Sequence, residues 1–301
     1  MALWQTAVLV RLIAVAIVVY GSRKAMARTT RTHTLFGQFA LAALWTNVVA
    51  IWLGEWSLSL LTFISVGVGL LNGAANFFMW NANAISTSRN GFFTAFDDVA
   101  AMALMMLFVP GAAAAVSYST SLGMALCVVS AVALAWVNYR KIKCGGEGAI
   151  APVFYVYAIG YALSWGIAIF CIGYFAIQQV GVWRFISGWY LGASIATLSI
   201  MMLDRSGYVP RPTNLETPKT SIFIREVVTI SIANSSALVL QYTAFAAVSL
   251  VILQPAFLIM DIVVPLIIGI MVFGEKKQFS KADVVLYGAG ALGFFLIVFG
   301  R

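Results

Sequence analysis

Ten apolar runs, each about as long as a bilayer is thick, constrain this chain more than any other feature of its sequence. A helix needs roughly 20 apolar residues to cross the hydrocarbon core. Such runs lie at 3–24, 34–54, 57–80, 91–113, 118–138, 151–177, 182–203, 222–247, 250–273 and 283–300. Only 9% of the 301 residues are charged, whereas a soluble domain typically has about 25%. The sequence therefore predicts an all-α polytopic membrane protein with ten transmembrane helices.

The polar segments between these runs are too short to form a soluble domain; the longest are 21–34, 139–149 and 204–220. The formal net charge of +8 comes mainly from Lys and Arg in such segments. Basic residues at these places orient a membrane protein and contact anionic lipid headgroups. We therefore expect contact with the lipid bilayer, no nucleic-acid partner, and a location in the inner (plasma) membrane of the cell.

The cysteines and the one histidine give no sign of a metal or a cofactor. Cys127, Cys144 and Cys171 lack CxxC spacing, and His33 lies in a basic segment. The nucleotide-binding pattern GxxxxGK[ST] does not occur. We expect neither a metal nor a cofactor, so that any transport would draw on gradients of ions or substrate.

A GGEG stretch at the middle of the chain separates five apolar runs from five and indicates an internal repeat. Three segments of the first half align in order on the second: 18–22 on 163–167, 72–82 on 234–244, and 89–107 on 253–271. The third alignment pairs Asp97 with Asp261. Because each copy has an odd number of spans, the copies enter the membrane in opposite orientations. We predict two inverted five-helix repeats, 1–144 and 151–301, joined by a linker at 145–150.

The chain from Val251 to its end resembles the EamA-like proteins of the drug/metabolite transporter superfamily. In that family a span with an early proline leads to a Gly-Glu turn and a glycine-rich last span. These places are held here by Pro255, Gly274, Glu275, Gly288 and Gly290, while SWG (164–166) and WRF (183–185) resemble the first and second spans of a repeat. The resemblance implies a ten-helix, inverted-repeat transporter that moves small polar or amphiphilic metabolites by alternating access. The first half departs from the pattern, because PGAAAA follows its fourth span without a Gly-Glu.

Three carboxylates, Asp97, Asp98 and Asp261, lie well inside predicted spans, and each costs roughly 2.5–3.5 kcal/mol to insert at the centre of a bilayer. If the repeat is correct, Asp97 and Asp261 lie on corresponding helices and face a shared axis, and we predict that they bind the substrate or a proton. Asp98 points about 100° away from Asp97 on a helix and is expected to partner a basic or amide group. Asn90, Thr94 and Asp98, spaced four residues apart, form one polar stripe.

The acids also have a structural interpretation. They could be neutral, or paired with Arg11, Arg89 or Arg184, and only hold helices together. The same arginines could instead serve a sugar-phosphate or nucleotide-sugar exchanger of the same fold. Three intramembrane acids favour an amine-bearing or zwitterionic substrate over such an anion.

Pro265 adds a backbone group to the site, because it lacks the N–H that would bond the carbonyl of Asp261. A carboxylate beside a freed carbonyl favours a cation, an ammonium group or a proton. Pro265 and Pro255 are predicted to bend their helix or to act in gating.

Polar and aromatic residues of the third, fourth, sixth, eighth and ninth spans complete the candidate site. The polar candidates are Asn72, Asn76, Asn81, Asn234, Gln241, Gln254 and Tyr242, which could equally hydrogen-bond between helices. The aromatic candidates for a cation–π wall are Trp80, Phe93, Trp165, Tyr242 and Phe257, which could equally serve packing.

The basic residues predict an orientation. Fifteen of the 18 Lys and Arg residues lie in the odd-numbered loops or beside them. The positive-inside rule then puts these loops in the cytoplasm and both termini outside. Members of the resembled family more usually have both termini inside.

Together these features predict a secondary transporter, not an enzyme. Its substrate would be a small polar, cationic or zwitterionic metabolite, amine or amino-acid-like, and a proton is a second candidate partner. A membrane-embedded hydrolase would need a Ser–His, paired-Asp or zinc-ligand set, of which only a bare Asp pair is present. A non-transporting scaffold would not need carboxylates at corresponding depths. Two repeats in one chain make a monomer sufficient, and a dimer is compatible with the prediction.

Overall fold

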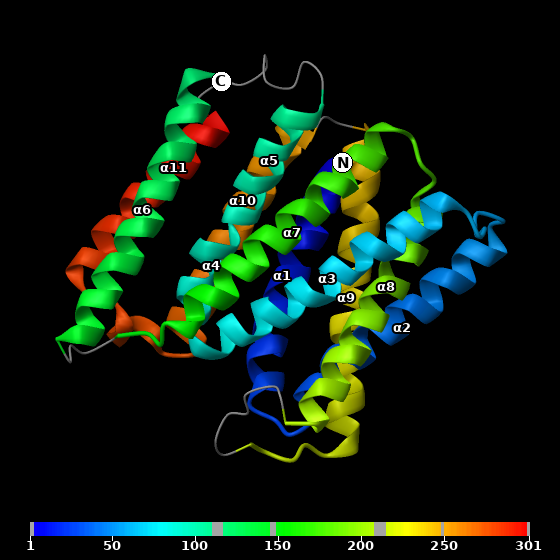
Figure 1. Ribbon diagram of the computed structural model, residues 1–301, viewed down its shortest axis with the longest axis horizontal. Coiled ribbons are helices and arrows are strands. Elements are labelled where there is room, and N and C mark those ends of the chain that lie inside the picture. The colour runs from blue at the N-terminus through cyan, green and yellow to red at the C-terminus, as the bar shows by residue number, and fades with distance from the viewer. Residues whose placement is uncertain (1–2, 110–116, 145–148, 208–214, 248–249, 300–301) are drawn as a thin grey trace.

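The computed structural model describes residues 3–109, 117–144, 149–207, 215–247 and 250–299, nearly all of them in helices (Figure 1). In chain order these are α1 (Leu3–Met26), α2 (Arg31–Trp52), α3 (Leu60–Ile85), α4 (Thr87–Thr94), α5 (Phe96–Phe108), α6 (Tyr118–Lys143), α7 (Val153–Ile177), α8 (Val182–Arg205), α9 (Thr220–Ala247), α10 (Leu250–Ile267), the π-helical turn η2 (Ile268–Val272), the 3₁₀ turn η3 (Glu275–Gln278) and α11 (Lys281–Phe299). Within the described ranges the only pairing of the β type is one isolated bridge, between Arg28 and Glu216.

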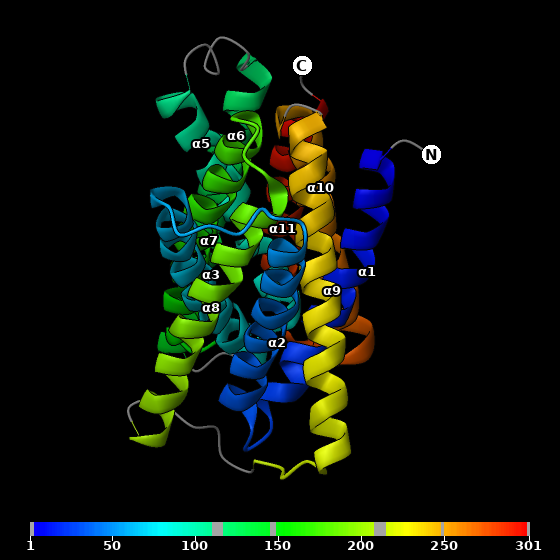
Figure 2. The same ribbon diagram turned by 90° about the vertical axis from the view of Figure 1, so that its right-hand side faces the viewer.

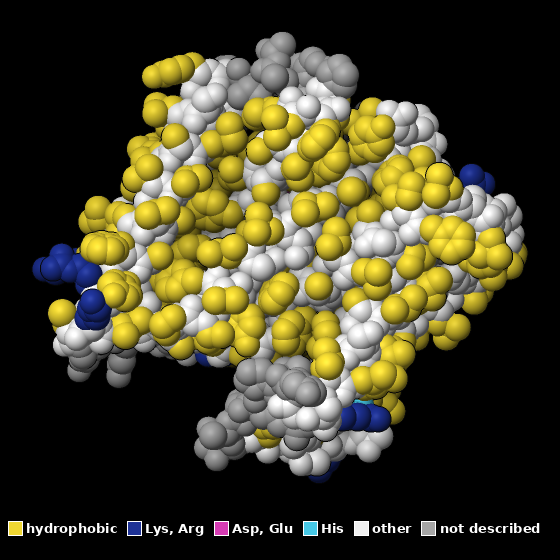
Figure 3. Space-filling view, in the orientation of Figure 1, with side chains coloured by type: hydrophobic (Ala, Val, Ile, Leu, Met, Phe, Trp, Pro, Cys, Tyr) yellow, Lys and Arg dark blue, Asp and Glu magenta, His cyan; other side chains and the backbone are white. Residues whose placement is uncertain are grey.

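Among the described residues, eight helical segments are long and apolar enough to cross a membrane: α1, α2, α3, α4 together with α5, α6, α7, α8 and α9. The other two predicted spans, 250–273 and 283–300, are occupied by α10 with η2 and by α11. Large hydrophobic side chains are exposed along the helices, and Figure 3 shows them spread over one face while Lys and Arg lie near its edges. The protein is therefore an all-helical, multi-pass integral membrane protein, as its sequence predicts.

The fourth predicted span is broken. Where the sequence suggests one helix over 91–113, the structure has α4 and α5, which meet at Ala95. Thr94 Oγ1 donates a hydrogen bond to the Gly91 carbonyl, 3.0 Å away. Such a side-chain bond competes with the hydrogen bonds of the helix itself. Because of the break, side chains four residues apart on either side of Ala95 need not share a helical face.

A carboxylate from the far end of the chain fixes where α4 begins. Gly274 has a φ of 67° and turns the chain so that Glu275, only 2% exposed, reaches the start of α4. Its two oxygens accept from the backbone N–H groups of Thr87 (2.9 Å) and Ser88 (2.8 Å), and one pairs with Arg23 at 3.5 Å. This satisfies orphan donors at a helix start with an anion. The Gly-Glu turn thus binds the last third of the chain to the first.

The two halves interlock. In the first half α1 packs on α9 and on α10; in the second, α7 packs on α3 and on α5. Three further pairs, α2 with α8, α4 with α10 and α6 with α11, join one helix from each half. Figures 1 and 2 show these pairs side by side. Neither half therefore buries its helices alone.

The α2–α8 pair carries a carboxylate at each end. Glu55 Oε2, beyond the end of α2, accepts from the backbone N–H groups of Trp183 (3.2 Å) and Arg184 (3.3 Å) at the start of α8. Asp204, at the end of α8, accepts from Thr32 Oγ1 (2.8 Å) and pairs with Arg31 (3.1 Å) at the start of α2. At each end of this antiparallel pair, a carboxylate at the end of one helix thus contacts the start of the other helix.

The tightest crossing, α3 on α8, depends on glycine. Gly69 on α3 faces Gly192 on α8, while Gly73 on α3 faces Ala193 and Gly188 on α8 faces Ser65. Each glycine pair has the small-xxx-small spacing that lets membrane helices approach closely. A Cβ on Gly69 would collide with the backbone of Trp189. Small residues here set the distance between the helices.

Several helix ends gather at one end of the molecule. α1, α6, α8 and α10 end toward the bottom of Figure 1, where α2, α7, α9 and α11 begin, while α1 begins and α11 ends toward the opposite end. Basic residues lie in the last turns of the helices that end here, among them Lys24 of α1, Lys141 of α6 and Arg205 of α8, and we call this the basic end. Ion pairs also join helices at this end. Asp283 pairs with Lys141 (2.5 Å) and with Arg89 (3.4 Å).

We expect Gly69→Ala to lower the unfolding temperature of the purified protein in detergent. The added methyl group has no room at the crossing, and overpacking of this kind typically costs about 1–3 kcal/mol. Gly67→Ala is the matched control, because a Cβ on this exposed position of the same helix meets nothing within 4 Å. Equal unfolding temperatures for the two variants would contradict the close approach of α3 and α8.

Candidate functional site

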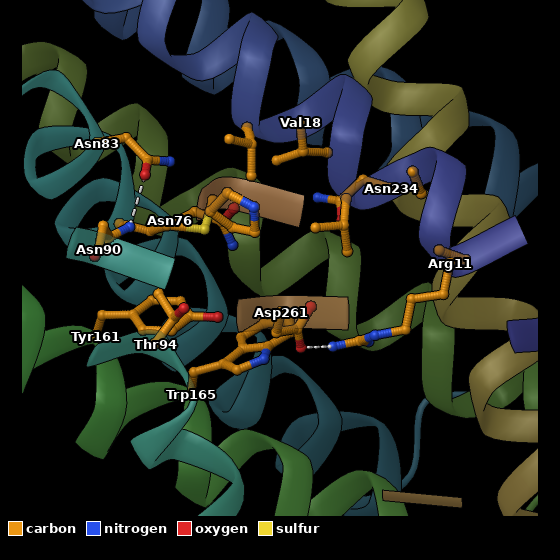
Figure 4. Close-up of a pocket in the computed structure, with 16 residues that line it drawn as sticks. Arg11, Val18, Asn76, Asn83, Asn90, Thr94, Tyr161, Trp165, Asn234 and Asp261 are labelled. Atoms are coloured by element: carbon orange, nitrogen blue, oxygen red, sulfur yellow. Dashed lines mark hydrogen bonds and ion pairs between the residues drawn. The ribbon is translucent and has the colours of Figure 1, made fainter. Parts of the chain in front are cut away.

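A cavity with about 90 Å³ open to the centre of a water molecule lies between helices of both halves (Figure 4). α1, α3, α4, α7, α9 and α10 all contribute to it. Its lining residues are Arg11, Ala14, Val15, Val18, Val19, Asn76, Met79, Asn83, Asn90, Thr94, Tyr161, Trp165, Asn234, Ala237, Asp261 and Pro265. The wall thus combines one acid, one base and several amides with apolar groups.

An ion pair between α1 and α10 holds the charged part of the wall. Arg11 Nη2 lies 2.6 Å from Asp261 Oδ2, and Figure 4 shows the Arg11 side chain reaching toward Asp261. Arg11 Nη1 donates to Gln241 Oε1 at 2.5 Å, and its guanidinium lies over the Phe257 ring, 4.8 Å from the centroid. Arg11 and Asp261 are 7% and 9% exposed. The pairing with Arg11 considered from the sequence is present, and it lies in the cavity wall.

Asp97 and Asp98 lie behind the wall and do not line the cavity. They stand in the first turn of α5, where the N-terminal end of the helix favours negative charge. Asp97 Oδ1 accepts from the backbone N–H of Asp98 at 2.7 Å, and its Oδ2 has no hydrogen-bond partner among the described residues. The backbone of Asp97 packs on Gly166 of α7. Asp97 still interacts through space with Asp261 and with Arg11.

The predicted stripe of Asn90, Thr94 and Asp98 is only partly brought together. Asn90 and Thr94 line the cavity, whereas Asp98 does not. The reason is the break at Ala95, which interrupts the four-residue spacing between Thr94 and Asp98.

Asparagines from α3, α4 and α9 supply most of the neutral polar wall. Asn90 Nδ2 donates to Asn83 Oδ1 at 2.7 Å, a bond marked in Figure 4, and Asn76 Nδ2 donates to Asn72 Oδ1 at 2.8 Å. Asn234 lines the cavity from α9. Asn83 is not among the sequence candidates, although its spacing of seven residues from Asn76 places both on one face of α3.

The predicted aromatic wall is dispersed. Trp165 lines the cavity, joined by Tyr161, which the sequence analysis does not single out. Phe257 lies under Arg11. Tyr242 donates its hydroxyl hydrogen to the Val180 carbonyl at 2.9 Å.

Two other aromatic candidates belong to the packed interior. Trp80 is fully buried, and Phe93 contacts Phe154 edge-on at 5.6 Å between ring centroids. Asn81 bonds its own helix, since Nδ2 donates to the Phe77 carbonyl at 2.8 Å. None of these three side chains lines the cavity.

Pro265, predicted to bend its helix or to act in gating, lines the cavity close to Gly91 of α4. A Cβ on Gly91 would come within 2.7 Å of Pro265 and 3.2 Å of the Asp261 carbonyl oxygen, so glycine keeps this approach open. The side chains of Gln254 and Pro255 lie outside the residues whose side chains the structure describes.

A smaller chamber, with about 30 Å³ open to the centre of a water molecule, adjoins the cavity at Arg11, Trp165, Asn234 and Ala237. Its other lining residues are Asn72, Trp189, Tyr190, Leu238 and Gln241. Trp189 and Tyr190 are not among the sequence candidates, because an apolar helix shows no preferred face by sequence alone. Asn72 and Asn234, paired by the repeat alignment, both line this chamber.

The described residues hold no group of three or more His, Cys, Asp or Glu that could bind a metal ion. The three arginines considered for an anion site do not converge. Arg89 pairs with Asp283 near the basic end, and Arg184 lies against Glu55 at the start of α8. Only Arg11 faces the cavity.

Comparisons with known proteins identify the fold and nothing finer. No protein-family model and no curated protein matches the sequence. Eight chains of solved structures match, among them one described as "Crystal structure of protein". It has 15% sequence identity and a TM-score of 0.57, over 97% of this chain and 96% of its own. The chain therefore shares its whole helical fold with a protein of solved structure.

Breaking the Arg11–Asp261 pair on one side should destabilise the protein, because the remaining charge stays buried without a counter-charge. Removing one partner of a buried pair costs about 3–5 kcal/mol, whereas replacing both with apolar residues is often neutral. We expect Asp261→Leu and Arg11→Met each to lower the free energy of unfolding in detergent, and the double variant to recover most of the loss. A double variant as unstable as the sum of the single variants would show that the two charges do not interact.

Proposed function

We propose that the protein is a secondary transporter that moves a small polar, cationic or zwitterionic metabolite by alternating access, and that it is not an enzyme. The observation that carries the proposal is the cavity, in which one acid, one base and four asparagines meet between helices of both halves. Intramembrane charged residues that face a cavity mark substrate or ion pathways by default. A cavity shared between two halves is where such transporters bind their substrates.

The packing supports two inverted repeats, 1–144 and 151–301. Exchanging the halves helix by helix turns the α1–α9 contact into α7–α3, and α1–α10 into α7–α5. The pairs α2–α8, α4–α10 and α6–α11 map onto themselves. The same exchange turns the Glu55 contact with α8 into the Asp204 contact with α2. This pattern agrees with the EamA-like resemblance of the last spans, which we retain as a proposal.

The lining favours an amine-bearing substrate over a sugar phosphate. A phosphate needs several converging basic groups, and Arg11 is the only basic residue among those that line the cavity. The Asp261 carboxylate, one helical turn before Pro265, can bind an ammonium group in the cavity. A proton remains the proposed coupling ion, with Asp97 and Asp261 as the groups that would carry it.

We expect Ala237→Phe to abolish transport in proteoliposomes without preventing folding. Ala237 lines both the cavity and the chamber, so a ring at this place fills the path. Ala125→Phe, on the lipid-facing side of α6, is the control. Uptake would be measured for labelled amino acids, a polyamine and a sugar phosphate. Undiminished uptake of a transported compound by a folded Ala237→Phe variant would remove the cavity from the pathway.

We also propose that the basic end faces the cytoplasm and both termini face outward. Cys144, exposed at the end of α6, should then react with a membrane-impermeant maleimide only after the cells are opened. Tags at either terminus should be accessible to antibody in intact cells. Labelling of Cys144 in intact cells, with both tags hidden, would reverse the orientation.

A further inference from the structure

We infer that the small chamber beside Arg11 is a carboxylate-binding subsite, and that the transported metabolite is therefore a zwitterionic amino acid. The inference rests on the proposed transport function and adds to it the chemical class of the substrate. It also assigns roles to Arg11, Trp165, Trp189 and Gln241.

Four of the side chains that line the chamber carry a hydrogen-bond donor without a partner among the described residues. Trp165 Nε1, Trp189 Nε1, Gln241 Nε2 and Arg11 Nε are all buried and have no hydrogen-bond partner among the described residues. All four side chains line the chamber. An indole N–H and a guanidinium N–H can only donate. A buried donor without a partner is costly, so such a set favours a ligand with strong acceptors. A carboxylate supplies these acceptors in a compact group.

The adjoining cavity presents acceptors instead. Asp261 Oδ2 binds Arg11, and the Asp261 carboxylate faces the space that Asn90 and Thr94 line. Asn90 Oδ1 is buried and lacks a partner among the described residues. An ammonium group can only donate, and it would satisfy these oxygens. Donors on one side of Arg11 and acceptors on the other match the two charged ends of an amino acid.

Charge balance favours the same ligand. Arg11 and Asp261 neutralise each other in the described structure. An amine that drew Asp261 away would leave the Arg11 guanidinium buried without its partner carboxylate, and an anion on Arg11 would leave Asp261 unpaired. A zwitterion places an opposite charge on both. Asp97 and Asp98 also act on Arg11 through space, but neither lines the cavity or the chamber.

The test compares ligands that differ by one charged end. Purified wild type would be titrated calorimetrically with the standard amino acids, and each one that binds would be tested again as its α-amide and as its N-acetyl derivative. We expect either change to weaken binding about tenfold or more, because each removes one charge-assisted contact. Tetramethylammonium and inorganic phosphate serve as probes with a single kind of charge.

Trp189→Phe removes one donor from the chamber and nothing from the acceptor side. It should weaken binding of the free amino acid about tenfold while leaving the already weak α-amide unchanged. Trp136→Phe, 62% exposed on α6, is the matched control. Because Trp189 is fully buried, Trp165→Phe provides a second test if the first variant does not fold.

The outcomes separate the subsite from the transport function. Binding of α-amides or tetramethylammonium as tightly as free amino acids would overturn the carboxylate subsite. Binding of no amino acid by the wild type, or unchanged affinity in folded Trp189→Phe and Trp165→Phe, would overturn it as well. If the wild type transports an amine without a carboxylate, and Ala237→Phe blocks that transport, the transport function is supported and the carboxylate subsite is not.

Discussion

The ion pair between Arg11 and Asp261 is the interaction on which the interior of this protein depends. Charges at membrane depth are tolerated only when other protein groups or water satisfy them. This pair joins the first helix to the ninth span, with Gln241 and Phe257 completing the surroundings of the guanidinium. Because it lies in a cavity wall, the contact that joins the two halves is also open to competition from a ligand.

Carboxylates outside the cavity have a different task. Glu275, Glu55 and Asp204 each bind the start of a helix that belongs to the other half of the chain. Glu55 and Glu275 accept from the unpaired backbone N–H groups of a helix start. Asp204 and Glu275 pair with a nearby arginine. Asp261, Asp283 and Glu226 each pair with a basic residue of the other half. Together with Glu275, Glu55 and Asp204, they make six of the ten acidic residues of the sequence that contact a basic group or a helix start. The few charges of this chain mainly connect its halves.

The sequence predicts the helices well, because a run of about 20 apolar residues matches the thickness of the bilayer core, where the backbone must form a helix. It also predicts Asp261, Asn90 and Trp165 in the cavity wall, since polar groups in such runs rarely face lipid. It misses the break at Ala95, where Thr94 Oγ1 bonds the Gly91 carbonyl, and therefore places Asp98 on the same face as Asn90 and Thr94. Trp189 and Tyr190 could not be singled out, because only the packing partners of an apolar helix decide which side is inside.

The glycines at the α3–α8 crossing have a mechanical consequence. With backbones in direct contact, these helices cannot slide or tilt against each other without a steric clash, and Gly123 against Gly293 ties α6 to α11 in the same manner. Two stiff frames thus flank the interior. The backbone is softer in α10, which contains Pro265 and leads into the π turn η2, and at the break between α4 and α5, so these segments are where the interior can change shape.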